Sequence, residues 1–286
     1  MPSDEPSLGL PALAGGQSEA TPATTAVVGA LRRIVWAGIA GWPIVTAVLW
    51  QASSHLAAGY IFGIHALAFY GVLRANCGLY GPVVKRFVTD RKEVWLTIDD
   101  GPFPDDTAEM LAVLARYRVP ATFFLEGARI RQSPELARAI TAAGHSLGNH
   151  SQNHRVGWFW SSGPQAAHRE IAECNAALES TDATPIGFRA PVGMANYFVH
   201  RAAQTAGLPV IGWSARGFDG LDRDPERVIA RLRPQIRPGA IILLHQRRGR
   251  REGEPGNAPI LAALLETLEA QGYRCVLPSP QQFLSL

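Results

Sequence analysis

The stretch VWLTIDDGP, residues 94–102, joins a short apolar run to two adjacent carboxylates, Asp99 and Asp100. The run is rich in β-branched and aromatic residues, which predicts a buried strand. Adjacent residues at the end of a strand begin on opposite faces. The pair could therefore be a helix cap, a metal site or an acid/base pair, and these nine residues do not choose among them. Asp105 and Asp106 are interpreted as first-turn acids of the next helix.

From Glu93 onward, short apolar runs alternate with helical patterns. The predicted strands span residues 94–98, 121–126, 145–149, 186–190, 209–215, 240–245 and 273–277. The predicted helices span residues 105–117, 134–143, 165–179, 197–206, 225–233 and 258–271. Such alternation predicts a mostly parallel sheet. We therefore expect an α/β fold of about seven parallel strands over residues 93–286, either a distorted (β/α) barrel or a doubly wound sheet.

The composition excludes several classes of protein. A net charge of +3 over 286 residues is no argument for nucleic acid as a partner. The chain has no G-x-G-x-x-G or Walker-type phosphate loop. Its three cysteines, Cys77, Cys174 and Cys275, are widely separated, which argues against a disulfide framework or a cysteine zinc site.

The first quarter of the chain differs from the rest in amino-acid composition. Residues 1–25 are rich in Pro, Gly, Ser, Thr and Ala, which predicts a disordered tail without a cleaved signal. Residues 34–50 and 56–73 carry no charged side chain and approach the length that crosses a bilayer. We expect residues 26–74 to form a two-helix transmembrane anchor, with residues 75–92 as a linker. The alternative is a pair of buried core helices.

The charges that flank these segments predict their orientation. Arg32 and Arg33 precede the first segment, Arg74 follows the second, and the link QASSH has no basic residue except a histidine. The positive-inside rule then places both ends, and the downstream domain, in the cytoplasm at a bacterial inner membrane. If only one segment spans, the domain is periplasmic instead.

Polar residues fall at the ends of the predicted strands. They are Asp99, Asp100, His150, His154, Arg189, Asp219 and His245. In a parallel α/β sheet all strand carboxyl ends lie on one face, so we expect these side chains to converge.

NHSQNH, residues 149–154, places His150 and His154 four residues apart. On a helical turn both imidazoles would point the same way and could hold one metal ion. Two surface histidines that bind no metal would show the same spacing, and this alternative is equally common. A carboxylate from another strand end would complete a site with open positions for water and substrate.

At this point the sequence resembles a known family. TIDDGP, HSQNH, RAPVG, WSARGFD and ILLH are similar, in this order, to the five motifs of the polysaccharide deacetylases of the NodB-homology type, carbohydrate esterase family 4. The resemblance covers roughly residues 93–286. It implies a distorted (β/α) barrel that removes N- or O-acetyl groups from sugars with a divalent metal, most commonly zinc.

The resemblance also implies a role for each matching residue. Asp99 would be the general base, while Asp100, His150 and His154 would hold the metal. Arg189 would orient Asp99 and keep it ionised.

The resemblance also implies a general acid. His245 would protonate the departing amine, and Asp219 would keep His245 protonated. The backbone N–H near Val192 would face the developing oxyanion. Where many members carry an acidic residue and a tryptophan, this chain has Arg216 and Gly220. Trp213 is interpreted as an aromatic wall of the sugar site, or else as a core residue.

Arg247 and Arg248 begin an arginine-rich stretch directly after the proposed acid. It is either a solvated loop or a site that recognises phosphate. The predicted substrate is therefore an acetylated amino sugar in a polysaccharide or a lipid-linked glycan, with no obligate protein partner. Two alternatives remain: a deformylase of a polyprenyl-phosphate-linked amino sugar, and a non-catalytic carbohydrate-binding relative.

Overall fold

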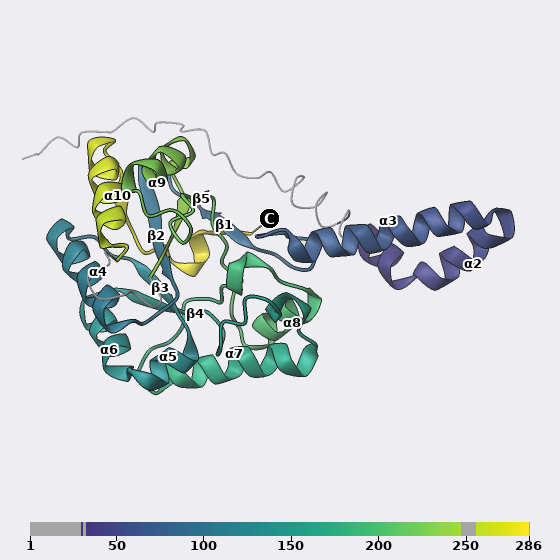
Figure 1. Cartoon of the computed structure of the whole chain (residues 1–286), viewed down its shortest axis with the longest axis horizontal. Helices are drawn as coiled ribbons and strands as arrows, with labels where there is room; N and C mark the ends of the chain where they lie inside the picture. The colour runs from purple at the N-terminus through teal and green to yellow at the C-terminus, as the bar shows by residue number, and fades with distance from the viewer. Residues whose placement is uncertain (1–29, 31–32, 247–255, 286) are drawn as a thin grey trace, which may run out of the picture.

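The computed structural model describes residue 30, residues 33–246 and residues 256–285. The predicted disordered tail, residues 1–25, and the predicted phosphate-recognising residues, Arg247 and Arg248, lie outside this part of the chain. The described residues form an α/β domain with two long helices that project from one side of it (Figure 1).

The domain is built on one curled sheet. Its main strand order is β4-β3-β2-β6-β1-β8, with β5 paired to β6 and β7 paired to β2. The strands are β1 (Val84–Phe87), β2 (Glu93–Asp99), β3 (Thr122–Leu125), β4 (Ser146–Asn149), β5 (Ala215–Arg216), β6 (Ala240–His245), β7 (Arg274–Cys275) and β8 (Phe283–Ser285).

The central strands are parallel, as predicted, but the sheet is not wholly parallel. β1 runs antiparallel to both β6 and β8. Residues 186–190 form no named strand, and Phe188 makes only isolated bridges to Asn149 and Val210. Most of the predicted strand 209–215 is likewise absent, since β5 begins only at Ala215. The expectation of seven parallel strands is therefore corrected to a curled, mixed sheet.

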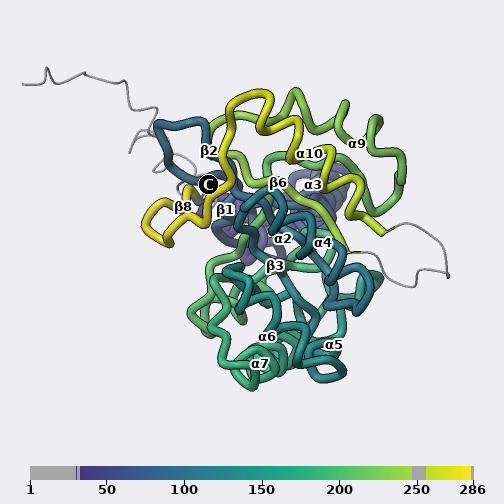
Figure 2. The backbone as a smooth tube through the Cα atoms, turned by 90° about the vertical axis from the view of Figure 1, so that its left-hand side faces the viewer, coloured from purple at the N-terminus to yellow at the C-terminus, as the bar shows by residue number. Residues whose placement is uncertain are grey.

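Helices surround the strands of the sheet (Figure 2). They are α4 (Pro104–Tyr117), α5 (Gly127–Gln132), α6 (Pro134–Ala142), α7 (Pro164–Glu179), α8 (Tyr197–Thr205), α9 (Pro225–Leu232) and α10 (Ala258–Ala270). α9 and α10 lie near one end of the sheet, and α5, α6 and α7 lie near the other (Figure 2). All of these helices except α5 match predicted helical stretches to within one residue at each end. Several start at a proline, whose fixed φ suits the first turn.

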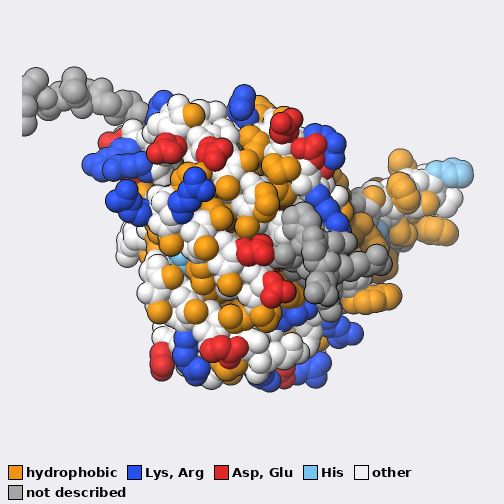
Figure 3. Space-filling view, turned by 60° about the vertical axis from the view of Figure 1, so that its left-hand side comes forward, with side chains coloured by type: hydrophobic (Ala, Val, Ile, Leu, Met, Phe, Trp, Pro, Cys, Tyr) orange, Lys and Arg blue, Asp and Glu red, His pale blue; other side chains and the backbone are white. Residues whose placement is uncertain are grey.

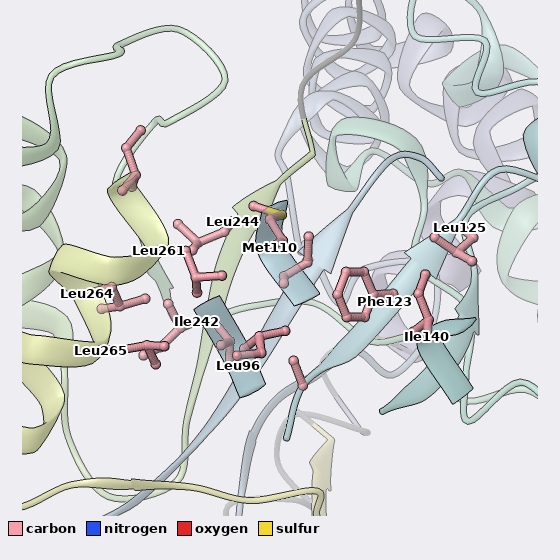
Figure 4. Packing of buried hydrophobic residues seen from close by; sticks show 14 of the residues in the cluster. Leu96, Met110, Phe123, Leu125, Ile140, Ile242, Leu244, Leu261, Leu264 and Leu265 are labelled. Carbon is pink, nitrogen blue, oxygen red and sulfur yellow. The ribbon is translucent and has the colours of Figure 1, made fainter. Parts of the chain in front are cut away.

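The main core lies between the sheet and these helices (Figure 4). Leu96 on β2 and Ile242 on β6 face Leu261 and Leu264 of α10, and all four side chains are fully buried. Burial of one leucine or isoleucine stabilises a fold by about 1.5–3 kcal/mol. This packing holds β2 and β6 side by side, and so holds their carboxyl ends together.

The two projecting helices are α2 (Trp42–Ala52) and α3 (Ser54–Leu73). α3 is long and apolar enough to cross a membrane, and 11% of it is buried. The predicted first span is not one straight helix, because the helical segment Arg33–Ala40 meets α2 at an angle of 71°. The break lies at Gly41, two residues before Pro43, which cannot donate the backbone hydrogen bond that would continue the helix.

Two further expectations about this region are corrected. The predicted link QASSH is almost entirely helical, and only Ser53 separates α2 from α3. The predicted linker, residues 75–92, contains β1, which pairs within the sheet. Residues after α3 are therefore part of the folded domain.

Candidate metal and catalytic site

The carboxyl ends of β2 and β6 bring the two acid/base candidates together. Asp99 is the last residue of β2 and lies directly opposite His245, the last residue of β6. Asp99 is 2% exposed. After it the backbone turns through a left-handed conformation at Asp100, with φ of 67°. Asp100 therefore leaves the strand in a different direction from Asp99.

Asp100, His150 and His154 form a cluster of potential metal ligands. One ligand atom from each lies within 4.8 Å of the others. Asp100 Oδ1 is 3.5 Å from His150 Nε2 and 3.3 Å from His154 Nε2. This buried oxygen has no hydrogen-bond partner among the described residues. An orphaned carboxylate oxygen facing two imidazole nitrogens is the donor set that a zinc-like cation accepts.

The two histidines meet by a different route from the one predicted. Residues 150–154 do not form a helical turn, because Ser151 and His154 both have positive φ. The loop is held by side chains: Asn149 Oδ1 accepts from the Ser151 N–H at 2.9 Å, and Ser151 Oγ accepts from the His154 N–H at 3.1 Å. The imidazole centroids are 4.7 Å apart. The spacing prediction was right about proximity and wrong about the helix.

The orientation of His150 is set by the backbone of the next motif. Its Nδ1 lies 2.8 Å from the carbonyl oxygen of Arg189. A carbonyl can only accept, so Nδ1 carries the proton and Nε2 faces the carboxylates. Metal-binding histidines are commonly held by such a bond.

The charges of this cluster perturb its titration. Burial alone would raise the pKa of Asp100, but the imidazoles of His150, His245 and His154 hold it well below its usual range. Burial, helped by His150, lowers the pKa of His154 to about 4. A neutral imidazole beside an ionised carboxylate is the protonation state that a metal ion requires.

Arg189 is a fully buried cation paired with Asp99. Its NH1 nitrogen donates to Asp99 Oδ1 at 2.6 Å and to the Thr97 hydroxyl at 2.8 Å. Its remaining nitrogens donate to the carbonyls of Ile211 and Gly212. The guanidinium therefore holds Asp99 in one position and leaves the Oδ2 atom as its second acceptor. Asp99 Oδ2 lies 3.7 Å from His150 Nε2, beside the metal cluster.

His245 is paired with Asp219 on the other side of the site. His245 Nδ1 lies 3.0 Å from Asp219 Oδ1, and the His245 N–H donates to Asp219 Oδ2 at 2.7 Å. Burial lowers the pKa of His245, but the Asp219 carboxylate outweighs it and raises the value to about 9. The pair therefore keeps a proton on the imidazole at neutral pH.

Two further residues, neither of them predicted to belong to the site, support this pair. Asn257 donates from Nδ2 to Asp219 Oδ2 at 3.3 Å and to the His245 carbonyl at 2.9 Å. Asp106 lies in the first turn of α4 as predicted, but it is fully buried and accepts from the Asn257 N–H at 3.1 Å. The buried Asp106 carboxylate therefore holds Asn257, in addition to its favourable interaction with the helix dipole.

Glu126 was also not predicted as a residue of the site, although it ends the predicted strand 121–126. It is 5% exposed and bonds to Arg129 at 2.9 Å. Burial raises the pKa of Glu126, and the Asp100 carboxylate adds to the effect against the lowering by Arg129. Its position at a strand end was the available signal.

The proposed substrate contacts occupy two environments. Val192 is 40% exposed in the turn Pro191–Gly193. Its φ of 51° is left-handed, so its backbone does not follow the path of a right-handed helix. Trp213 is only 7% exposed and packs in the core cluster with Ile211 and Phe124. Its ring therefore packs close to Gly193 and offers little surface to a sugar.

The fold and these residues define a class: an α/β protein with a curled sheet and a candidate Asp-His-His metal centre flanked by a carboxylate and a histidine. Comparison with known proteins identifies the family. The family model for polysaccharide deacetylases matches residues 87–211. A chitooligosaccharide deacetylase from Bradyrhizobium is 34% identical over 197 residues, which cover 68% of this chain and 87% of that protein.

A peptidoglycan-N-acetylglucosamine deacetylase from Bacillus cereus is 30% identical over 210 residues, covering 73% of this chain and 96% of that protein. The structure of a family 4 carbohydrate esterase from Streptomyces lividans superposes with a TM-score of 0.59 at 26% identity, over 68% of this chain and 96% of that one. The chain belongs to the polysaccharide deacetylase family, the family 4 carbohydrate esterases. The predictions of this family and of a hydrolase are confirmed.

Proposed function

We propose that the protein removes the acetyl group from an N-acetylated amino sugar in a glycan. The observation that carries this is the convergence of Asp99, the Asp100 cluster and the Asp219–His245 pair at the carboxyl ends of β2 and β6. The names of the relatives, which are deacetylases of chitooligosaccharide and peptidoglycan, support this substrate class.

A divalent cation, with zinc as our choice, would be held by Asp100, His150 and His154. Their grouping and the orphaned Asp100 oxygen fit such an ion. When bound, it would polarise the acetyl carbonyl and make water more acidic.

The residues of this chain would then divide the proton transfers. Asp99 would accept the proton of the attacking water at Oδ2, since Oδ1 is held by Arg189. His245 would donate a proton to the departing amine nitrogen, because Asp219 keeps its imidazole protonated. The backbone N–H of Val192 would stabilise the negative oxygen of the transition state.

The two adjacent aspartates test this division. Asp100→Ala should lose bound metal and activity together, whereas Asp99→Ala should retain the metal and lose about 100-fold or more in kcat, the usual contribution of a general base. Metal content by mass spectrometry and acetate release from N-acetylated chitooligosaccharide are the measurements. Equal metal loss in both variants, or full activity in Asp99→Ala, would contradict the proposal. Formate released from an N-formylated sugar, without acetate release, would indicate the deformylase.

We further propose that α2, α3 and the preceding helical segment anchor the domain in the bacterial inner membrane, with a lipid-linked acetylated amino sugar as substrate. The uncharged, largely unburied α3 supports this, as do Arg33 and Arg74 at the domain end of the hairpin. A phosphatase or fluorescent reporter fused after Leu286 would report sidedness. Phosphatase activity would contradict a cytoplasmic domain. Equal turnover of a water-soluble and a prenyl-phosphate-linked sugar would contradict the lipid-linked substrate.

A further inference from the structure

The segment that leaves α3 is tied directly to the proposed catalytic turn. The Asn76 N–H donates to the Gly193 carbonyl at 3.0 Å, and Asn76 Nδ2 donates to the Trp213 carbonyl at 3.1 Å. A side-chain carbon at Gly193 would lie 3.2 Å from the Ala75 Cβ, so the two backbones are in close contact. Only two residues separate the end of α3 at Leu73 from this contact. The hairpin and the turn Pro191–Gly193 therefore form one connected structure.

Four aromatic side chains surround the base of the hairpin, and we call them the aromatic collar: Trp36, Tyr80, Tyr197 and Phe198. The Trp36 ring lies 5.5 Å from Tyr80 and 4.9 Å from Tyr197, and Tyr197 lies 5.7 Å from Phe198. Trp36 Nε1 also donates to the Leu79 carbonyl at 3.3 Å, and the Tyr80 hydroxyl donates to the Ala68 carbonyl at 2.7 Å. The collar thus connects the helical hairpin to the start of α8.

The aromatic collar is only partly buried. Tyr197 and Phe198 each remain 40% exposed. They begin α8, which lies on the side of the domain from which the hairpin projects (Figure 1). The visible face of the hairpin itself is largely apolar (Figure 3). Arg33 and Arg74 are exposed at the same end. Aromatic rings beside basic residues at the end of an apolar helix match the headgroup region of a bilayer with anionic lipids.

The length of α3 places the membrane surface at this level. Its 20 residues span about 30 Å, the thickness of the hydrocarbon core. If Ser54 reaches the far side, Leu73 lies at the near side, adjacent to the collar. We infer that the aromatic collar rests in the headgroup layer of an anionic lipid bilayer and thereby holds the catalytic turn Pro191–Gly193 at the membrane surface. This inference rests on the proposed membrane anchor and adds a second, domain-borne contact with lipid.

Fluorescence quenching in vesicles tests the inference with the full chain. A single cysteine is introduced, labelled with an environment-sensitive fluorophore and reconstituted in phosphatidylcholine–phosphatidylglycerol vesicles with spin-labelled lipid. The half-buried Cys77 and Cys275 are replaced by alanine, and the buried Cys174 is retained. The test position is Phe198→Cys. Arg201→Cys, exposed about one turn further along α8, serves if the first variant misfolds.

Two controls separate the collar from the anchor. Phe62→Cys lies in the middle of α3, and Ala139→Cys lies exposed on α6, away from the hairpin (Figure 1). We expect quenching by headgroup spin labels at position 198, quenching by deep acyl-chain labels at position 62, and none at position 139. Quenching at 62 without quenching at 198 or 201 would overturn the collar inference and leave the anchor intact. Absence of quenching at 62 would overturn the anchor and the inference with it.

Discussion

The Arg189→Met substitution tests how the site is held in the core. Arg189 is fully buried, bonds to Asp99 at 2.6 Å, and satisfies the carbonyls of Ile211 and Gly212. Its guanidinium also lies 4.2 Å from the Phe124 ring centroid. Methionine keeps the apolar stem but leaves Asp99, 2% exposed, without its cation. Removing one partner of a buried ion pair costs about 3–5 kcal/mol. For a domain of this size, this lowers the melting temperature by about 6–20 °C.

The assay is denaturant unfolding of the full chain in detergent, followed by tryptophan fluorescence. The Asp99→Asn change added to Arg189→Met should recover part of the loss, because it removes the unpaired charge. Arg138→Met is the matched control: Arg138 is exposed with one bond to a carbonyl, so its loss should stay within about 0.5 kcal/mol. The reasoning is refuted if Arg189→Met costs less than about 1 kcal/mol, or if the double variant is no more stable than the single one.

Two further predictions concern the acid and the catalytic turn. Asp219→Asn removes the charge that raises the pKa of His245 to about 9, so the alkaline limb of kcat/KM should move to lower pH; an unmoved limb would exclude His245 as the acid that Asp219 supports. Gly193→Ala places a carbon 2.4 Å from the Trp213 ring at a φ of +70° and should lower both stability and activity. Gly144→Ala, at a φ of +85° with no atom within 4 Å, should cost only about 1 kcal/mol of backbone strain; equal losses in the two variants would show that the contact with Trp213 is unimportant.

The central strands β2, β3 and β6 were predictable because each is a short, mostly apolar run that is buried along almost its whole length. β2, β3, β4 and β6 all coincide with predicted strands, and β2 extends one residue beyond its prediction at each end. β1 was not predicted, because its sequence VKRF is only four residues long and carries two adjacent basic residues at its centre. Its place in the sheet depends on antiparallel pairing with β6 and β8, strands that are more than 150 residues away. Local sequence carries no signal for such a partner.

Some residues of the candidate site could likewise be predicted from the sequence, and others could not. The residues that end apolar strands, Asp99 and His245, were found from their position, since parallel strands share one carboxyl edge. Asn257 follows no strand, and its contact with Asp219 arises only when α10 packs beside β6. Asp106 was assigned to a helix dipole, which is correct for its place in the chain and omits its buried partner.

The sequence was therefore sufficient for the family, for the central strands and for the identity of the polar residues at their ends, because strand periodicity and short ordered motifs are local properties. It was not sufficient for the path by which His150 and His154 meet, which needs two residues at positive φ held by Asn149 and Ser151. Nor did it reveal that Asn76 ties the base of the apolar hairpin to the turn at Gly193. The contact of Asn76 with Gly193 joins residues 117 positions apart, and only packing of the whole chain brings them within hydrogen-bonding distance.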